Sequence, residues 1–196
     1  MIPGPTTSTT VTAQTARRKR LSQKPAAVVL GVLMLAVPLV PMILDAALPE
    51  REWSAAETAS DQITAVTDEG NVVAVETPQG WEALDQGTSA VLRNDGVTVV
   101  VEAFDLDQRD PEAVTDRLIR LHRIQGFTSA LDGGHVASPD GKLDGSTCVV
   151  VTESTTGTCA FVHDNDVIVS VISLGTPEQP APPISQVIDL ISKGQQ

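Results

Sequence analysis

An uninterrupted apolar run, Ala26–Leu44, constrains this chain more than any other feature, because its nineteen residues include no charged or strongly polar side chain. A helix of this length extends about 28 Å at about 1.5 Å per residue, and the hydrocarbon core of a bilayer is about 30 Å thick. The run is apolar on every face, which disfavours a helix that buries one side in a soluble core. We therefore predict a single transmembrane helix within residues 25–47, surrounded by membrane lipids.

Charge changes sign across this run. The first 44 residues contain no acid, whereas residues 45–196 contain all 25 acids and eight of the 13 bases, a net charge of −17. The other five bases directly precede the run: Arg17, Arg18, Lys19, Arg20 and Lys24. Because basic flanks stay on the cytoplasmic side, we predict a plasma-membrane protein with a cytoplasmic N-terminus and an extracytoplasmic C-terminal part. Residues 1–24 have almost nothing to bury and are predicted to be disordered, with their bases near anionic lipid headgroups.

A cleaved signal peptide is the main alternative to this anchor. Its apolar region is usually about 7–15 residues long, which is shorter than the run. Ala46 and Ala47 nevertheless form a weak small-residue site, and cleavage there would release a secreted domain. A lipoprotein anchor is excluded because no Cys follows the run directly. Trp53, close to the outer end of the run, fits the aromatic belt of a membrane interface.

Residues 48–70 are predicted to form a partly helical stalk. Ser54–Glu57 fits a capping box, in which the Ser and Glu side chains satisfy N–H groups at the start of a helix. The Ala-rich sequence that continues to Val66 predicts that this helix is short, with too little apolar surface to form a domain.

Short β-branched runs begin at Asn71 and predict strands, which alternate with two helices. The segment Asn94-Asp95-Gly96 between two such runs is a hairpin signal. Asp110 as N-cap, Pro111 and a terminal Gly126 predict the first helix. Apolar residues at a 3.6-residue period predict the second: Ile184, Val187, Ile188 and Ile191. The predicted strands are Val72–Glu76, Ser89–Arg93, Val97–Phe104, Cys148–Thr152, Cys159–His163 and Val167–Leu174.

This order of elements predicts an α+β domain over residues 71–194, in which two helices pack on an antiparallel sheet. The transmembrane helix and the stalk precede it. Cys148 and Cys159 lie on two predicted strands joined by one turn, and in an exported domain such a pair usually forms a disulfide. A free pair of thiols is the alternative; a metal site is disfavoured because no His lies at ligand spacing from both.

Motifs of catalysis or cofactor binding are absent from the sequence, so we predict no catalytic residue, metal or cofactor. His122, His135 and His163 are far apart, and His122 is expected on a solvated face beside arginines. The segment Asp105–Asp110 only faintly resembles a calcium loop, because Arg109 occupies a ligand position. The net charge of −12 and an aromatic content of 3% argue against a nucleic-acid partner.

The segment Val72–Trp81, which ends in Pro78-Gln-Gly-Trp81, resembles the opening strand of PsbP-like domains. The order of the later elements is also similar to theirs. Actinobacterial envelope proteins use this plan, including LpqN-type lipoproteins and a domain of type VII secretion-associated membrane proteins. The resemblance implies a binding or accessory role in the envelope, linked to secretion, and supplies no catalytic residues. We therefore expect an acidic extracytoplasmic domain that binds an envelope protein or component; the alternatives are an envelope hydrolase and a cleaved, secreted domain.

Overall fold

The computed structural model describes residue 34, residues 52–57 and residues 61–194. The chain divides into two compact units, Met1–Glu50 and Arg51–Gln196, and the fold below is that of the second. Apart from Met34, the predicted tail over 1–24 and the predicted membrane segment over 25–47 lie outside the described residues. Within the part that is described, no helix has the length and apolar character needed to cross a membrane.

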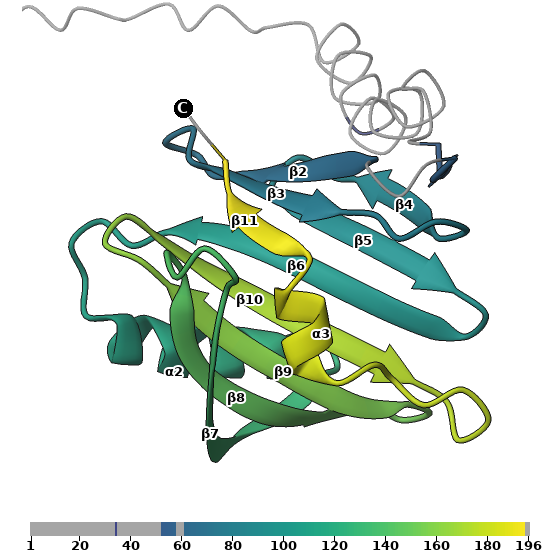
Figure 1. The fold of residues 1–196 in the computed structure, drawn as a ribbon. Coiled ribbons are helices and arrows are strands. Elements are labelled where there is room, and N and C mark those ends of the chain that lie inside the picture. The colour runs from purple at the N-terminus through teal and green to yellow at the C-terminus, as the bar shows by residue number, and fades with distance from the viewer. Residues whose placement is uncertain (1–33, 35–51, 58–60, 195–196) are drawn as a thin grey trace, which may run out of the picture. The chain divides into compact units, whose positions relative to one another are not determined.

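An eight-stranded antiparallel sheet forms the centre of the second unit, with the strand order β1-β4-β5-β6-β10-β9-β8-β7 (Figure 1). A smaller antiparallel sheet has the order β11-β3-β2. The strands are β1 (Ser54–Ala55), β2 (Gln62–Val66), β3 (Val72–Glu76), β4 (Glu82–Asp85), β5 (Ser89–Asn94), β6 (Val97–Asp105), β7 (Thr128–Ala137), β8 (Asp144–Val151), β9 (Thr156–His163), β10 (Val167–Gly175) and β11 (Ile191–Lys193). The helices are α2 (Pro111–Ile124) and α3 (Ile184–Ile188). The predicted α+β class, an antiparallel sheet with two helices, is confirmed.

Two apolar cores lie on opposite faces of the large sheet. Successive side chains of a strand point to opposite faces, so Val169 and Val171 of β10 enter one core while Ile168 and Ile172 enter the other. The first core includes residues of the small sheet and of α3, and the second includes residues of α2. Figure 1 shows the two helices on opposite faces of the sheet. Because both faces are covered, every residue of β10 is buried.

Local signals in the sequence predicted the β5–β6 hairpin and helix α2 correctly. Asn94 pairs with Val97, and the two turn residues between them have positive φ angles of 42° at Asp95 and 85° at Gly96, as a type I′ turn requires. At the start of α2 the Asp110 side chain accepts a hydrogen bond from the backbone N–H of Glu112.

The prediction of a helix within the stalk is wrong. Ser54–Ala55 is a strand of the large sheet and Gln62–Val66 a strand of the small sheet. Ile63 and Ala65 pack into the first core. An intrinsic helix preference amounts to a few tenths of a kcal/mol per residue, and pairing with β3 together with this burial overrides it. The folded unit therefore begins before residue 71.

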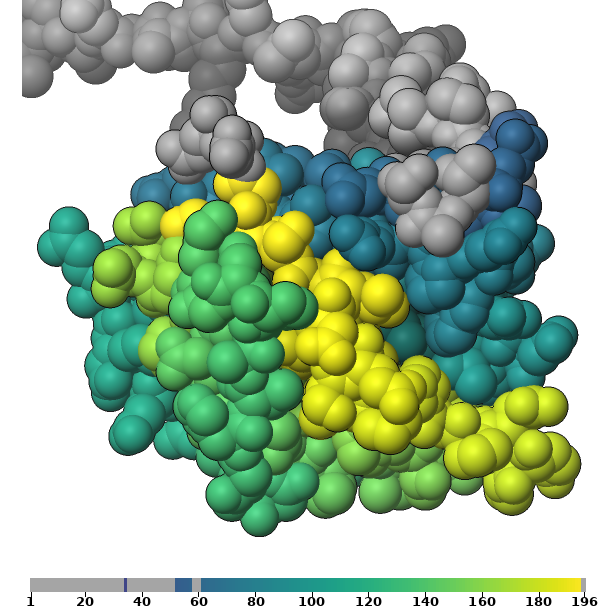
Figure 2. Space-filling model, viewed as in Figure 1, coloured from purple at the N-terminus to yellow at the C-terminus, as the bar shows by residue number. Residues whose placement is uncertain are grey.

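The last helix ends earlier than its periodicity predicts. Only Ile184–Ile188 is helical, and Ile191 lies in β11, where it pairs with Val75. All four predicted apolar side chains are nevertheless buried. In Figure 2, α3 and β11 fill the surface between β7 on one side and the β2–β5 segment on the other.

Strand β7 was not predicted, because Asp132-Gly133-Gly134 in its middle has the composition of a turn. The structure instead has an irregularity there, and the register with β8 shifts between Leu131 and His135. Gly133 has a φ angle of 81°. The Asp132 carboxylate accepts hydrogen bonds from the Gly134 N–H and the Thr147 hydroxyl, which hold the bulge against β8.

Candidate functional site

A groove of about 830 Å³ lies beside α2. The helix forms one wall, the end of β6 and the loop that follows it form another, and the turn at Asp68 and Glu69 closes one part. Helix α2 is amphipathic: Val114, Leu118 and His122 are buried against the sheet, and the opposite side is polar. The groove therefore opens along the boundary between the buried and the solvated faces of the helix.

Apolar side chains in this groove are exposed to solvent. Leu121 is 37% exposed and Ile124 is 85% exposed, and both line the groove together with the half-buried Phe104. Single exposed apolar residues are ordinary. Two large ones in adjacent turns of a helix, beside a groove with an apolar floor, are typical of a binding surface.

Arginines border the same apolar residues. Arg117 and Arg120 line the groove, and Arg123 is one turn further along α2. With Arg109, they make up four of the eight bases in residues 45–196. None of the residues that the structure describes forms an ion pair or hydrogen bond with the side chain of Arg117, Arg120 or Arg123.

Carboxylates gather where β6 ends and the loop to α2 begins. The Asp105 carboxylate accepts hydrogen bonds from the Glu69 N–H, at 3.0 Å, and from the Asn71 side chain, at 2.9 Å. Arg109 donates to the Asp105 carbonyl at 2.9 Å and forms an ion pair with Asp107. These contacts connect the β2–β3 turn to the loop before α2, which fixes this end of the groove.

Two carboxyl groups at this end of the groove have pKa values shifted in opposite directions. A side-chain hydrogen bond with Asp107, together with the charges of Asp107 and Asp105, raises the pKa of Glu69. Burial works to raise the pKa of Asp105, but hydrogen bonds from Thr67, Asn71 and the Glu69 backbone outweigh it and lower that pKa. Four carboxylates and one arginine line this end of the groove, whereas Arg117 and Arg120 line it along α2.

The prediction that His122 lies on a solvated face is wrong, because its side chain is fully buried. It follows Leu118 by one helical turn and so shares its buried side. The imidazole stacks on Phe161 at a centroid distance of 5.6 Å, and its Nε2 lies 3.1 Å from the Ser170 Oγ and 3.8 Å from a Glu102 carboxylate oxygen.

This cluster does not have the geometry of a catalytic triad. A triad uses one ring nitrogen for the serine and the other for the carboxylate, but Ser170 and Glu102 both face Nε2 of His122. The Nδ1 atom is buried without a hydrogen-bond partner among the described residues. Ser170 is 1% exposed, so a substrate cannot reach its hydroxyl.

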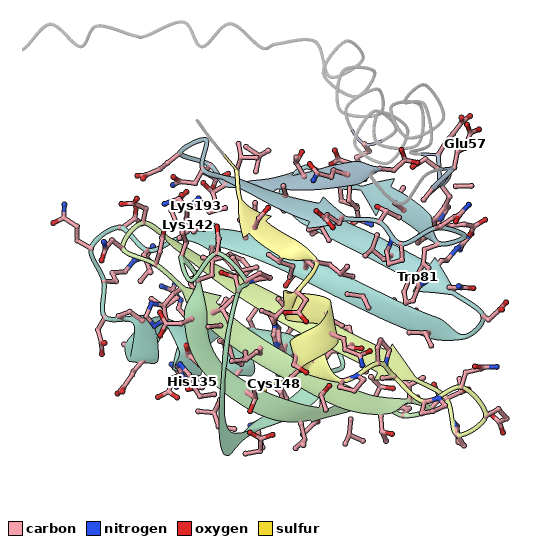
Figure 3. All side chains as sticks on the ribbon, in the orientation of Figure 1. Glu57, Trp81, His135, Lys142, Cys148 and Lys193 are labelled. Carbon is pink, nitrogen blue, oxygen red and sulfur yellow. A yellow bond between two sulfur atoms is a disulfide. The ribbon has the colours of Figure 1, made fainter. Side chains whose placement is uncertain are left out.

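The disulfide between Cys148 and Cys159 is present, as predicted. The two residues are direct partners in the β8–β9 register and are fully buried in the core beneath α2. Figure 3 shows Cys148 within the sheet and His135 on β7. His135 is exposed, with its Nε2 3.5 Å from an Asp144 oxygen.

Trp53, assigned from sequence to a membrane interface, contacts the folded unit itself. The Arg93 guanidinium lies 3.7 Å above the centre of its ring and also pairs with Glu82 at 2.6 Å. The five predicted membrane-proximal bases, Arg17, Arg18, Lys19, Arg20 and Lys24, lie outside the described residues.

Sequence reasoning did not identify the groove. The available signal was the concentration of bases between Arg109 and Arg123 in an otherwise acidic segment, but their position next to Phe104 and Glu69 depends on how the sheet and α2 pack.

In the described ranges, no group of three or more His, Cys, Asp or Glu side chains is placed to hold a metal ion. No family model matches the sequence, and no curated protein matches it.

Proposed function

We propose that this protein is a single-pass protein of the plasma membrane that holds a protein-binding domain in the cell envelope, with the groove beside α2 as its binding surface. The observation that carries the proposal is the exposed apolar pair Leu121 and Ile124 next to arginines that form no ion pair with any residue that the structure describes. Protein-binding surfaces combine such apolar side chains with a polar rim, and Arg is enriched in them.

Binding is favoured over hydrolysis by the nature of the two candidate centres. The groove is open and carries exposed apolar side chains, which suits a macromolecular partner. The buried His122 cluster lacks both the access and the two-sided hydrogen bonding that nucleophilic catalysis needs. A nucleic-acid partner is disfavoured by the net charge of −17 in residues 45–196.

Membrane attachment is supported by the sequence. Ala26–Leu44 is long enough to span a bilayer, and the bases that precede it favour a cytoplasmic N-terminus. Anchoring would raise the effective concentration of the domain near partners in the same envelope. The resemblance of Val72–Trp81 to PsbP-like domains of actinobacterial envelope proteins supports the same accessory role.

Orientation is tested with the full chain carrying different epitope tags at its two ends in bacterial spheroplasts. We expect external protease to remove the C-terminal tag and spare the N-terminal tag, and carbonate extraction to leave the chain in the membrane. Replacing Arg17, Arg18, Lys19 and Arg20 with Glu should weaken this orientation. An N-terminal tag digested in intact spheroplasts, or a soluble fragment that starts near Leu48, would contradict the anchored topology.

The binding surface is tested by placing a photo-crosslinking amino acid at Ile124 in the native envelope. A matched control places it at Glu153, an exposed residue of the β8–β9 turn outside the groove. We expect one identifiable envelope protein to be captured from position 124 and lost when Leu121 is also changed to Asp. Equal capture from both positions would refute the assignment of the groove.

A further inference from the structure

Three arginines follow one another along the exposed side of α2. Arg117, Arg120 and Arg123 are spaced by three residues, so neighbouring members lie on adjacent turns. Residues 45–196 hold 25 acids, yet none of the described residues pairs with these three side chains. On so acidic a domain, an unneutralised cationic stripe is a local reversal of the surface charge.

Apolar side chains run beside this stripe. Leu121 and Ile124 each follow an arginine by four residues, so Arg117 and Arg120 are their neighbours on the helix surface. Together these four residues form a short track on the helix surface that is both cationic and apolar. An occupant of this track must present both acidic and apolar groups.

The opposite end of the groove carries the opposite charge. Asp68, Glu69, Asp105 and Asp107 line it, and Arg109 is the single base among them. A side-chain hydrogen bond with Asp107, and then the charges of Asp107 and Asp105, raise the pKa of Glu69. A cationic group of an occupant placed there would relieve this repulsion.

We infer that the groove beside α2 takes an acidic amphipathic peptide segment of a partner protein, with acidic side chains on Arg117 and Arg120, apolar side chains on Leu121 and Ile124, and a basic group at Glu69. The inference rests on the proposed function, because it names the partner chemistry of the same site. It follows from charge complementarity, since arginines line one part of the groove and carboxylates line another.

An anionic membrane surface fits this groove less well. Its phosphates would meet the arginines, but they would also meet the four carboxylates at the other end and a domain with a net charge of −17. A peptide can place a base at the carboxylate end and acids along the arginines, which a headgroup surface of one sign cannot do.

The test selects binders from a random displayed peptide library on the full chain in phosphatidylcholine nanodiscs, after depletion on empty nanodiscs. We expect enriched peptides to have net negative charge, alternating apolar residues and one terminal base. Arg117→Glu with Arg120→Glu should weaken the best peptide about tenfold, which corresponds to about 1.4 kcal/mol. Arg93→Glu with Lys142→Glu changes the net charge equally outside the groove and should leave affinity within about twofold.

Glu69→Gln separates the two ends of the groove. It should weaken peptides that carry the terminal base and leave peptides without that base unchanged. Enrichment of basic peptides, or equal loss in both charge-reversal pairs, would overturn the inference. Binding of the chain to phosphatidylglycerol vesicles through Arg117 and Arg120, without peptide enrichment, would assign the stripe to a membrane surface and also overturn it. If crosslinking from Ile124 succeeds but the captured segment is basic, only this inference fails and the proposed function stands.

Discussion

Removal of the disulfide between Cys148 and Cys159 should lower the free energy of unfolding by at most about 3 kcal/mol. The cysteines are 11 residues apart, and the loop-entropy relation gives about 2.8 kcal/mol at 25 °C for a loop of that size. The β8–β9 turn is also closed by hydrogen bonds, with Thr152 N–H to the Thr155 carbonyl and Thr155 N–H to the Thr152 hydroxyl, both at 2.9 Å. Any hairpin retained in the unfolded chain would make the loss smaller.

Two perturbations separate the crosslink from the packing. Reduction of the native sequence breaks the bond and leaves both sulfur atoms in the core, whereas Cys148→Ala with Cys159→Ala also empties fully buried volume. The reduced protein should therefore be more stable than the double variant. Thermal unfolding followed by circular dichroism should show a melting temperature that is lower for the reduced protein by at most roughly 6–12 °C, from about 2–4 °C per kcal/mol.

The rate of reduction provides a second check. Both cysteines are 0% exposed in the core beneath α2, so a reductant reaches them only when this region opens locally. Reduction in native buffer should be far slower than in denaturant, and exposed-surface substitutions on α2 should not change it. The reasoning would be refuted by equal rates in the two conditions, by no stability loss on reduction, or by two free thiols in the denatured, unreduced protein.

Other side chains make separate predictions. His122→Ala should lower the free energy of unfolding by about 2–4 kcal/mol, as for other buried large-to-small changes. The change at an exposed neighbour, Arg123→Ala, should stay within about 0.5 kcal/mol. Urea unfolding compares the two variants, and equal losses would contradict the burial of His122. Burial acts to raise the pKa of Asp164, but hydrogen bonds from Lys193 and the backbone lower it overall. The contribution of Asp164 to the free energy of unfolding is therefore present above the ordinary pKa of 3.8 and lost as pH falls through the lower folded pKa. Lys193→Met should weaken this dependence on acid pH. An unchanged pH profile of the melting temperature in that variant would refute the reasoning. Truncation after Pro183 removes four buried apolar side chains worth roughly 1.5–3 kcal/mol each, and a cooperatively melting product would show that α3 and β11 are dispensable.

Features that depend on a few neighbouring residues could be predicted from the sequence. Asp95-Gly96 supplies the positive φ angles of a tight hairpin, and Asp110 caps α2, whatever the rest of the chain does. The disulfide was also predictable, because one short turn places Cys148 opposite Cys159. The apolar run Ala26–Leu44 and the charge change across it are likewise properties of the sequence, and they carry the proposed topology.

The tertiary structure decided what depends on distant partners. Gln62–Val66 is a strand because β3 pairs with it, and Ile191 leaves its helical pattern because Val75, more than a hundred residues earlier in the chain, offers a strand edge. His122 is buried because α2 packs with that side against Phe161, which its neighbouring arginines did not indicate. The groove exists for the same reason. Its lining comes from the turn at Asp68 and Glu69, from the end of β6 with the loop that follows, and from α2, and only the packing of α2 against the sheet brings these segments together.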